Sequence, residues 1–208
     1  MKPAPVRLFA AALLCLCATA PALSVEATLA VGSTPLSLCF EPGAAKIYCA
    51  CRTSNDVWVI DGATNEVLGP VAVGADPRQV VAAGGRAWCA CFGADAVAVI
   101  DPDGDTVRAL IGTGSGPVAL VAETVTGKIY CANRTGNSLS VIDPAAETLL
   151  VKLSAGEWPI ALCATPGRVY AANWSSGTVT VVDALTDSVV ATVPVGLQPC
   201  WVYADSAS

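Results

Sequence analysis

An internal repeat constrains this chain more strongly than any other feature of its sequence. Five segments combine a small residue with a following proline: VGSTP, VGADP, TGSGP, AGEWP and VGLQP, which end at Pro35, Pro77, Pro117, Pro159 and Pro199. An aromatic motif, YCAC, WCAC, YCAN or YAAN, begins at Tyr48, Trp88, Tyr130 and Tyr170. A third motif, VWVID, VAVID, LSVID or VTVVD, ends at Asp61, Asp101, Asp143 and Asp183. All three motifs recur at steps of 40 or 42 residues, so the chain consists of repeated structural units.

Each period divides into four short apolar runs separated by turn residues. In the first period, these runs are residues 35–41, 46–51, 56–61 and 66–73. Four strands in a period of this length predict an all-β fold, a β-propeller built of four-stranded blades. Four complete blades are expected, at residues 35–73, 77–112, 117–154 and 159–195. We name the strands of each blade A to D, from the innermost to the outermost.

The repeat pattern extends beyond the four blades at both ends. Residues 25–31 (VEATLAV) match a leading D strand, and residues 199–203 match a trailing A strand that begins a partial blade. These leftovers are the outermost and the innermost strands of a blade, so they cannot pair with each other. We therefore expect an open arc, or a fragment of a larger ring, whose missing blades come from the rest of the chain or from another protomer.

The first 24 residues have the pattern of a secretory signal peptide. Lys2 and Arg7 precede the apolar stretch LFAAALLCLCATA, which is short for a membrane span, and small residues follow. Residues 25–208 are then the propeller domain, secreted to the periplasm or cell surface, with no membrane span. Signal removal takes away two of the 11 basic residues and none of the 17 acidic residues, which leaves a net charge of −8. This charge argues against a nucleic-acid partner.

The eight cysteines after residue 24 allow three interpretations. Because Ala or Asn fills their positions in other repeats, the first is that most are small buried residues with free thiols. The second is a disulfide such as Cys39–Cys49, across the first A–B hairpin. The third is a zinc site formed by the two C-A-C motifs, but these lie on adjacent blades, about 10 Å apart. Free thiols are favoured, and no metal site is expected.

The sequence offers little catalytic chemistry. It contains no histidine, which removes the most common general base and the histidine-containing catalytic triads. The aspartates that end the third strands precede GATN, PDGD, PAAE and ALTD, where a carboxylate stabilises a turn by accepting a backbone N–H. We therefore predict no catalytic residues, no cofactor and no enzymatic activity.

Binding residues are expected where the repeat varies. The D–A crossovers and the B–C loops emerge on one face of a propeller, and we call this the loop face. Blade 4 places both Trp158 and Trp174 there, where they form a stacking platform for a ligand or pack on the neighbouring blade. Arg78 lies just inside strand A of blade 2, so it points toward the central channel or caps a turn.

The repeat resembles a known family. The pattern G-x-x-P, then YCAN or YAAN, then SVID or TVVD, then SVVATVPVG is similar to the YVTN-type β-propeller repeat, over about residues 26–203. This resemblance implies a secreted or surface-associated bacterial or archaeal protein, and a ring of about seven blades. It implies a fold and a compartment rather than a particular reaction.

Two functional classes follow. The favoured one is a secreted, non-enzymatic interaction or scaffold module that binds a protein or cell-envelope partner through its loop face. The alternative, a lactonase-like or cofactor-using enzyme with its site at the central channel, comes from related propellers alone. An enzyme is expected to bring carboxylates or arginines together at the channel mouth.

Overall fold

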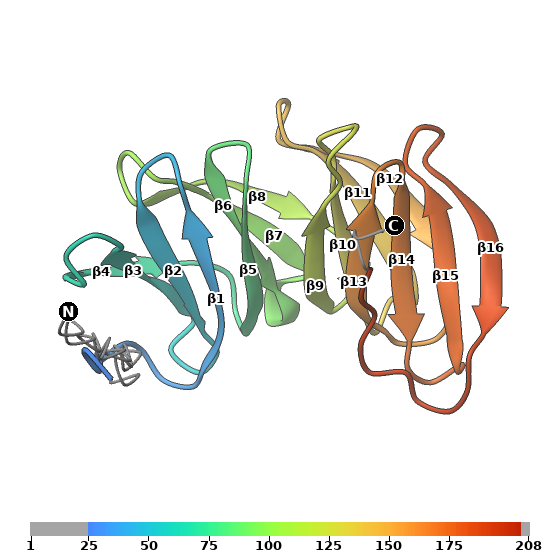
Figure 1. Ribbon diagram of the computed structural model, residues 1–208, viewed down its shortest axis with the longest axis horizontal. Helices are drawn as coiled ribbons and strands as arrows, with labels where there is room; N and C mark the ends of the chain where they lie inside the picture. Colours follow the sequence, from blue (N-terminus) through green and yellow to red (C-terminus); the bar gives the residue numbers. More distant parts are fainter. Residues whose placement is uncertain (1–24, 205–208) are drawn as a thin grey trace, which may run out of the picture.

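Residues 25–204, which the computed structural model describes, form four antiparallel β-sheets of four strands each. The sheets are arranged as a fan, with the first blade at one end and the fourth at the other (Figure 1). Strands pair in chain order within each sheet. The all-β architecture of four-stranded blades is therefore confirmed, whereas the predicted signal peptide, residues 1–24, falls outside the described residues.

The strand bounds follow the repeat closely. Blade 1 contains β1 (Pro35–Glu41), β2 (Lys46–Cys51), β3 (Asp56–Asp61) and β4 (Val67–Ala72). Blade 2 contains β5 (Pro77–Ala83), β6 (Arg86–Cys91), β7 (Ala96–Asp101) and β8 (Thr106–Gly112). Blade 3 contains β9 (Pro117–Ala122), β10 (Ile129–Asn133), β11 (Ser138–Asp143) and β12 (Thr148–Ser154). Blade 4 contains β13 (Pro159–Thr165), β14 (Arg168–Asn173), β15 (Thr178–Asp183) and β16 (Ser188–Pro194). In blade 1, the first three strands have the predicted bounds and β4 is one residue shorter at each end.

Consecutive blades pack face to face through apolar cores. Tyr48 and Val59 of blade 1 belong to one core with Ala87 and Cys89 of blade 2, and similar cores join blades 2 and 3 and blades 3 and 4. The first strands of consecutive blades, β1, β5, β9 and β13, also contact one another in turn, as expected of innermost strands. Sheets covered on both sides need apolar residues on both faces, which explains the high hydrophobic content of the chain.

The two end blades each have an uncovered face. In blade 2, the residues Ala96–Ile100 of β7 are all buried, because neighbouring blades cover both sides of the sheet. In blade 1, Leu38 and Phe40 are 65% and 53% exposed, and every residue of β16 in blade 4 is exposed. Within residues 25–204, no further blade covers these surfaces, as the predicted open arc requires.

The two flanking segments differ from the prediction. Residues 25–31 and 199–203 are not strands, although they match strands D and A in sequence. A β-strand needs a neighbour for its backbone hydrogen bonds, and the described residues provide none at either place. The only helical segment in residues 25–204 is the short 3₁₀ turn Phe92–Ala94, and this part of the chain has no helix with the length and hydrophobicity to cross a membrane.

The aspartates that end the third strands stabilise turns, as predicted. Asp61 Oδ1 accepts hydrogen bonds from the backbone nitrogens of Ala63 and Thr64 at 2.9 and 2.8 Å. The backbone N–H groups of Thr64 and Ala63 lower the pKa of this carboxyl because they stabilise its charged form. Equivalent bonds form at Asp101, Asp143 and Asp183.

The cysteines described by the structure are free thiols, which confirms the favoured interpretation. Five of the eight are buried: Cys49, Cys51, Cys89, Cys91 and Cys131. The Cys39–Cys49 disulfide is incompatible with the strand register, in which Cys39 is opposite Tyr48 while Cys49 is opposite Leu38. The two cysteine side chains therefore point to opposite faces of the sheet.

Candidate functional site

The loop face is built from repeated backbone contacts between the crossovers and the B–C loops. The residue that follows each B strand donates its N–H to the carbonyl of the residue before the repeat proline. Trp174 bonds to Trp158 in this way, at 2.9 Å, and Arg134 bonds to Gly116 at 2.8 Å. These bonds place the side chains of two variable positions next to each other in every blade.

At the three crossovers between blades, the residue before the repeat proline is left-handed and donates its N–H to a side chain of the preceding blade. Trp158 has a φ of 54°, which is uncommon for a bulky residue, and its N–H donates to Asn137 Oδ1 at 3.0 Å. Asp76 has a φ of 55° and donates in the same way to Asn55 Oδ1 at 2.8 Å. The interaction between blades therefore fixes the direction in which Trp158 leaves the backbone.

Trp158 and Trp174, which the sequence placed together on the loop face, form one stacked pair. Their ring centroids are 5.4 Å apart and the ring planes differ by 16°. The guanidinium carbon of Arg134 lies 4.5 Å from the ring centroid of Trp158. Trp158 is 38% exposed, so this cation–π contact lies at the surface, where it contributes about 0.5–1 kcal/mol.

Arg78 lies in a second cluster on the same face. Its guanidinium stacks over Phe92 at 4.7 Å and pairs with Asp76 at 2.7 Å. The other carboxylate oxygen of Asp76 binds Arg52 at 2.9 Å. The Nε atom of Arg78 is buried and has no hydrogen-bond partner among the described residues. Arg78 therefore lines the groove and belongs to a polar cluster with Asp76; its prediction as a residue that points toward the central channel or caps a turn stays a prediction.

An open groove of about 420 Å³ connects the two clusters. Its lining residues are Leu36, Arg78, Val118, Arg134, Ile160 and Trp174. Four of them directly follow the repeat proline of their blades, so the innermost strands form the floor of the groove. The lining contains two cationic side chains, one aromatic ring and three apolar side chains, but no acidic residue.

The composition of this groove suits an anionic group next to an apolar one. Arginine remains protonated at every physiological pH and donates to carboxylates and phosphates in a fixed planar geometry. Two arginines, Arg78 and Arg134, line this groove, which is part of the pattern expected of an enzyme. However, no lining side chain is a carboxylate, thiol, hydroxyl or imidazole, and arginine is a poor proton-transfer group. Within residues 25–204, no three side chains form a possible metal-binding cluster.

Sequence reasoning missed Arg134 and Phe92. Both belong to the position after strand B, which is occupied by Arg52, Phe92, Arg134 and Trp174 in the four blades. All four side chains are large and end in a planar group, and this shared property is the sequence signal by which the position could have been found. The cation–π contacts themselves depend on spacing between blades, which the sequence of one blade does not contain.

Comparison with known proteins identifies the fold. A family model described as YNCE-like beta-propeller matches residues 21–207. This match supports a β-propeller repeat family in general rather than the YVTN type in particular. A search of curated protein sequences found no significant match.

Several solved structures resemble the chain. Hydrazine synthase of Kuenenia stuttgartiensis matches with a TM-score of 0.71 and 18% identity, over 83% of this chain and 53% of that chain. The dihydro-heme d1 dehydrogenase NirN, in complex with DHE, matches with a TM-score of 0.67 and 14% identity, over 82% of this chain and 40% of that chain. Apo AztD from Citrobacter koseri matches with a TM-score of 0.64 and 16% identity, over 82% of this chain and 49% of that chain. This chain spans about half the length of these structures or less, and at such identities the likeness shows the fold alone.

Proposed function

This chain belongs to the YNCE-like β-propeller family, and we propose that it is a non-enzymatic interaction module that binds a protein or cell-envelope partner through its loop face. The supporting observation is the groove, where Arg78, Arg134 and Trp174 surround an apolar floor without an acidic residue. A partner that presents a carboxylate beside an apolar side chain fits this surface. The YVTN-type character of the repeat, and secretion to the periplasm or cell surface, are parts of the same proposal.

Three properties of the site support binding rather than catalysis. Arg134 stacks on Trp158, and the Trp158 N–H is bound by the side chain of Asn137 from the preceding blade, so little side-chain entropy is lost when a partner binds. Tryptophan and arginine are also the residues most often responsible for binding energy at protein interfaces. The groove is open to solvent along its length, whereas enzymes usually exclude water from the reacting groups. Of the features expected of the enzymatic alternative, the groove has two arginines but no carboxylate.

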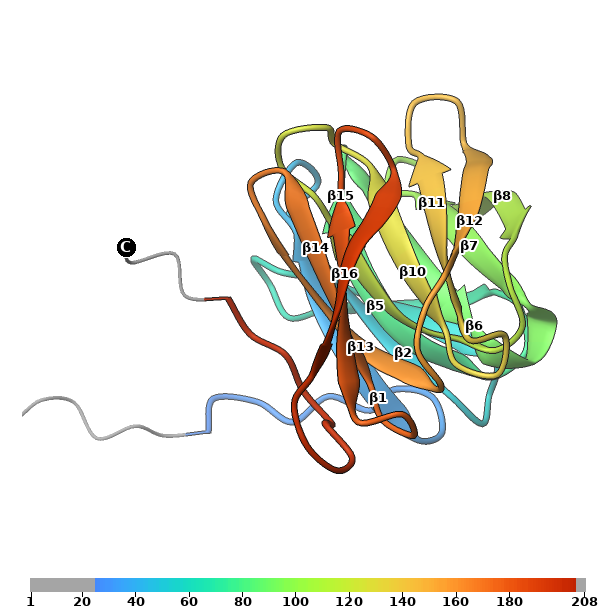
Figure 2. The same cartoon turned by 90° about the vertical axis from the view of Figure 1, so that its right-hand side faces the viewer.

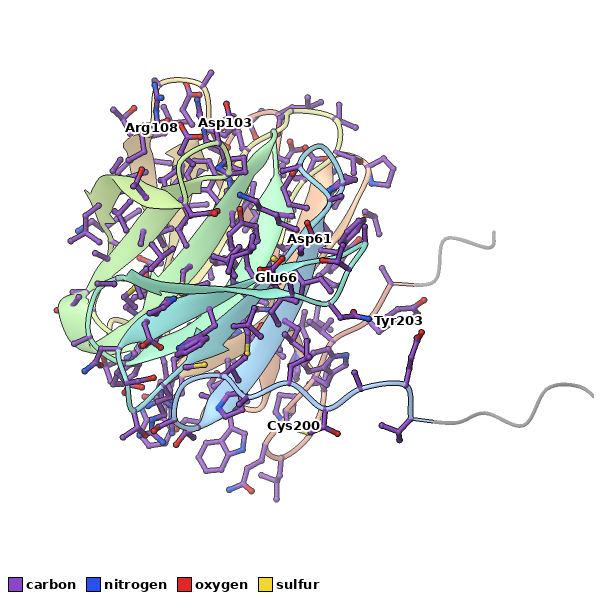
Figure 3. The ribbon with its side chains drawn as sticks, turned by 90° about the vertical axis from the view of Figure 1, so that its left-hand side faces the viewer. Asp61, Glu66, Asp103, Arg108, Cys200 and Tyr203 are labelled. Carbon is purple, nitrogen blue, oxygen red and sulfur yellow. The ribbon has the colours of Figure 1, made fainter. Side chains whose placement is uncertain are left out.

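The test is site-specific photo-cross-linking in the envelope fraction of the source cells. A photoreactive amino acid replaces Leu36, which lines the groove and is 49% exposed. The control position is Arg108, whose side chain is 51% exposed and lies at the opposite end of the blades from Cys200 (Figure 3). The proposal predicts a discrete partner cross-linked at position 36 and not at position 108. Equal labelling at both positions, or none at either, contradicts it.

A further inference from the structure

One basic side chain of the loop face has no polar partner among residues 25–204. This part of the chain contains nine lysines and arginines, and seven of them pair with a carboxylate. Lys152 donates to the backbone carbonyl of Thr113. The guanidinium of Arg134 has neither kind of partner within the same residues and stacks on the ring of Trp158. Because arginine stays protonated, its N–H donors are available for an anion from outside these residues.

The repeat shows why Arg134 lacks a carboxylate. Arg52 occupies the equivalent position of blade 1, and its Nε atom binds Asp76, the residue before the next repeat proline, at 2.9 Å. In blade 3, the same register brings Arg134 to Trp158, which also precedes the next repeat proline. Asp76 and Trp158 have nearly the same backbone conformation, with φ values of 55° and 54°. A tryptophan therefore stands where the repeat elsewhere has the carboxylate that neutralises the arginine.

Arg78, the other arginine of the groove, is already engaged. It pairs with one carboxylate oxygen of Asp76 at 2.7 Å, while the other oxygen of Asp76 binds Arg52. One carboxylate thus serves two guanidinium groups, which leaves this cluster with a net positive charge. Arg78 adds positive potential to the groove, but Arg134 is the side chain whose donors are open to a ligand.

An apolar hollow lies beside these cations. The groove continues between the innermost strands as a second hollow of about 240 Å³, and the two share Leu36, Arg78, Val118 and Ile160. These strands contact one another in turn, and a view from the blade 4 end shows the sheets one behind another (Figure 2). The further lining residues are Ser37, Gln79, Ala119, Ala161, Leu162 and Trp201.

The two polar residues in this hollow are occupied. Ser37 Oγ accepts the backbone N–H of Val80 at 3.2 Å, and Gln79 Oε1 accepts that of Leu120 at 2.6 Å. Both bonds join an innermost strand to that of the next blade. The hollow therefore favours an aliphatic side chain over a polar one.

The cation and the apolar floor lie close together. Ile160 is two residues from Trp158, on which the guanidinium of Arg134 stacks. Val118 is two residues from Gly116, whose carbonyl accepts the Arg134 N–H at 2.8 Å. A ligand that reaches both must carry a carboxylate and an apolar side chain within about one residue of each other, a Cα spacing of about 3.8 Å.

This spacing favours the end of a peptide chain. In an extended segment, adjacent side chains point to opposite sides, so an aspartate or glutamate next to an aliphatic residue directs only one of the two groups into the groove. The last residue of a peptide carries its carboxylate and its side chain on the same Cα atom. Both groups then face the groove together.

We propose that the loop-face groove captures the free C-terminus of a peptide chain that ends in an aliphatic residue. Arg134 binds the terminal carboxylate as Arg52 binds Asp76, and the last side chain enters the hollow between Val118 and Ile160. Capture of a terminal carboxylate is a recurrent mode of peptide recognition. This inference rests on the proposed function, because it names the class of ligand for the same site.

Three short peptides test the inference by NMR titration of the natural chain, followed through the indole N–H signal of Trp174. The first is acetyl-Ala-Ala-Leu with a free carboxylate, and the second is its C-terminal amide. The third, acetyl-Ala-Asp-Leu-amide, carries the carboxylate on a side chain. The free acid should bind at least about tenfold more tightly than either amide, as expected when hydrogen bonds to a charged group are lost.

Two matched variants test the role of Arg134. Trp158→Asp recreates in blade 3 the ion pair of Arg52 and Asp76, at a left-handed position where the repeat already tolerates aspartate. Trp158→Asn also removes the ring but leaves Arg134 without a carboxylate. We expect Trp158→Asn to bind acetyl-Ala-Ala-Leu more tightly than Trp158→Asp does. Arg134→Gln should weaken binding of this peptide at least about tenfold, and Arg108→Gln, at the opposite end of the blades, should leave it unchanged.

Several results would overturn the inference. A free acid that binds no more tightly than its amide shows that no terminal carboxylate is recognised, and equal binding of acetyl-Ala-Asp-Leu-amide assigns the site to side-chain carboxylates. Undiminished binding to Arg134→Gln, or equal binding to the two Trp158 variants, removes the role of Arg134. If none of the peptides binds, although the partner cross-linked at position 36 does, the inference is wrong and the proposed function stands. A cross-linked partner that binds Arg134→Ala/Trp174→Ala with the natural affinity contradicts the proposed function instead.

Discussion

The buried carboxylate of Glu123 gives a quantitative test of how adjacent blades are joined. Glu123 is 1% exposed and accepts four hydrogen bonds of 2.7–2.9 Å, from the backbone nitrogens of Gly167, Val125 and Thr126 and the hydroxyl of Thr126. Gly167 belongs to blade 4, so this carboxylate links two blades. Burial alone would raise its pKa, but the hydrogen bonds outweigh burial and lower it from 4.5 to about 2.

This lowered pKa makes a stabilising contribution that depends on pH. A carboxyl with a lower pKa in the folded than in the unfolded chain stabilises fully above the unfolded value, 4.5, and this stability is lost as the pH falls toward about 2. The difference between the two pKa values corresponds to about 3 kcal/mol. Glu123→Gln removes the charge and turns an amide NH₂ toward backbone donors. The variant should therefore lose about 3 kcal/mol of unfolding free energy at pH 7.

Urea unfolding, followed by tryptophan fluorescence between pH 7 and pH 2.5, measures this contribution. The difference between the natural chain and Glu123→Gln should be largest above pH 5 and decrease steadily as the pH falls toward 2.5. The matched control is Glu41→Gln, because Glu41 is also buried but accepts only from Gly43 and Ala44, in its own blade. Its substitution should cost about 1 kcal/mol. A difference for Glu123→Gln that does not change with pH would refute the reasoning.

Three other predictions follow from the packing. Tyr130→Phe removes the hydroxyl that binds Asp187 and should lower the free energy of unfolding in urea by about 1 kcal/mol. Tyr48→Phe should lower it less, because the buried Tyr48 hydroxyl has no partner in the described residues, and equal losses would contradict this prediction. Burial raises the pKa values of Cys39 and Cys51 to about 12, so among the cysteines of residues 25–204 Ellman's reagent should label only the exposed Cys200 rapidly in the native protein. Rapid labelling of a second one of these thiols would be the contrary result. Trp88→Ala, which empties a fully buried site, should cost about 3–5 kcal/mol, and Trp158→Ala should cost much less, since its side chain is 38% exposed; thermal unfolding compares the two.

The sequence predicted the blades because their determinants are local and repeated. Strand bounds follow from prolines, turn aspartates and apolar runs, each of which acts within a few residues, and a repeat presents the same signal four times. The flanking segments 25–31 and 199–203 have strand-like sequences as well, but a strand also requires a paired neighbour. Their conformation therefore depends on what surrounds them, which their own residues do not encode.

The candidate site was predicted only in part, for a related reason. Trp158, Trp174 and Arg78 were predicted because they lie at or beside the variable positions of the loop face. Arg134 did not stand out, because arginine also occupies its position in blade 1. Its importance comes from the 4.5 Å contact with Trp158, a residue that belongs to the following blade. The ion pairs Lys46–Asp105 and Lys128–Asp187, which join neighbouring blades, were not predicted for the same reason, since each joins residues more than fifty positions apart.

The affinity of the loop face for the partner identified by cross-linking tests the proposed function most directly. Calorimetric titration compares the natural chain with the double variant Arg134→Ala/Trp174→Ala, and with Arg108→Ala at the opposite end as the control. Because hot-spot residues of these types commonly contribute 2 kcal/mol or more, we expect the double variant to bind at least about thirtyfold more weakly. Arg108→Ala should bind like the natural chain. If the double variant keeps the natural affinity, the groove is not the binding site and the proposed function is wrong.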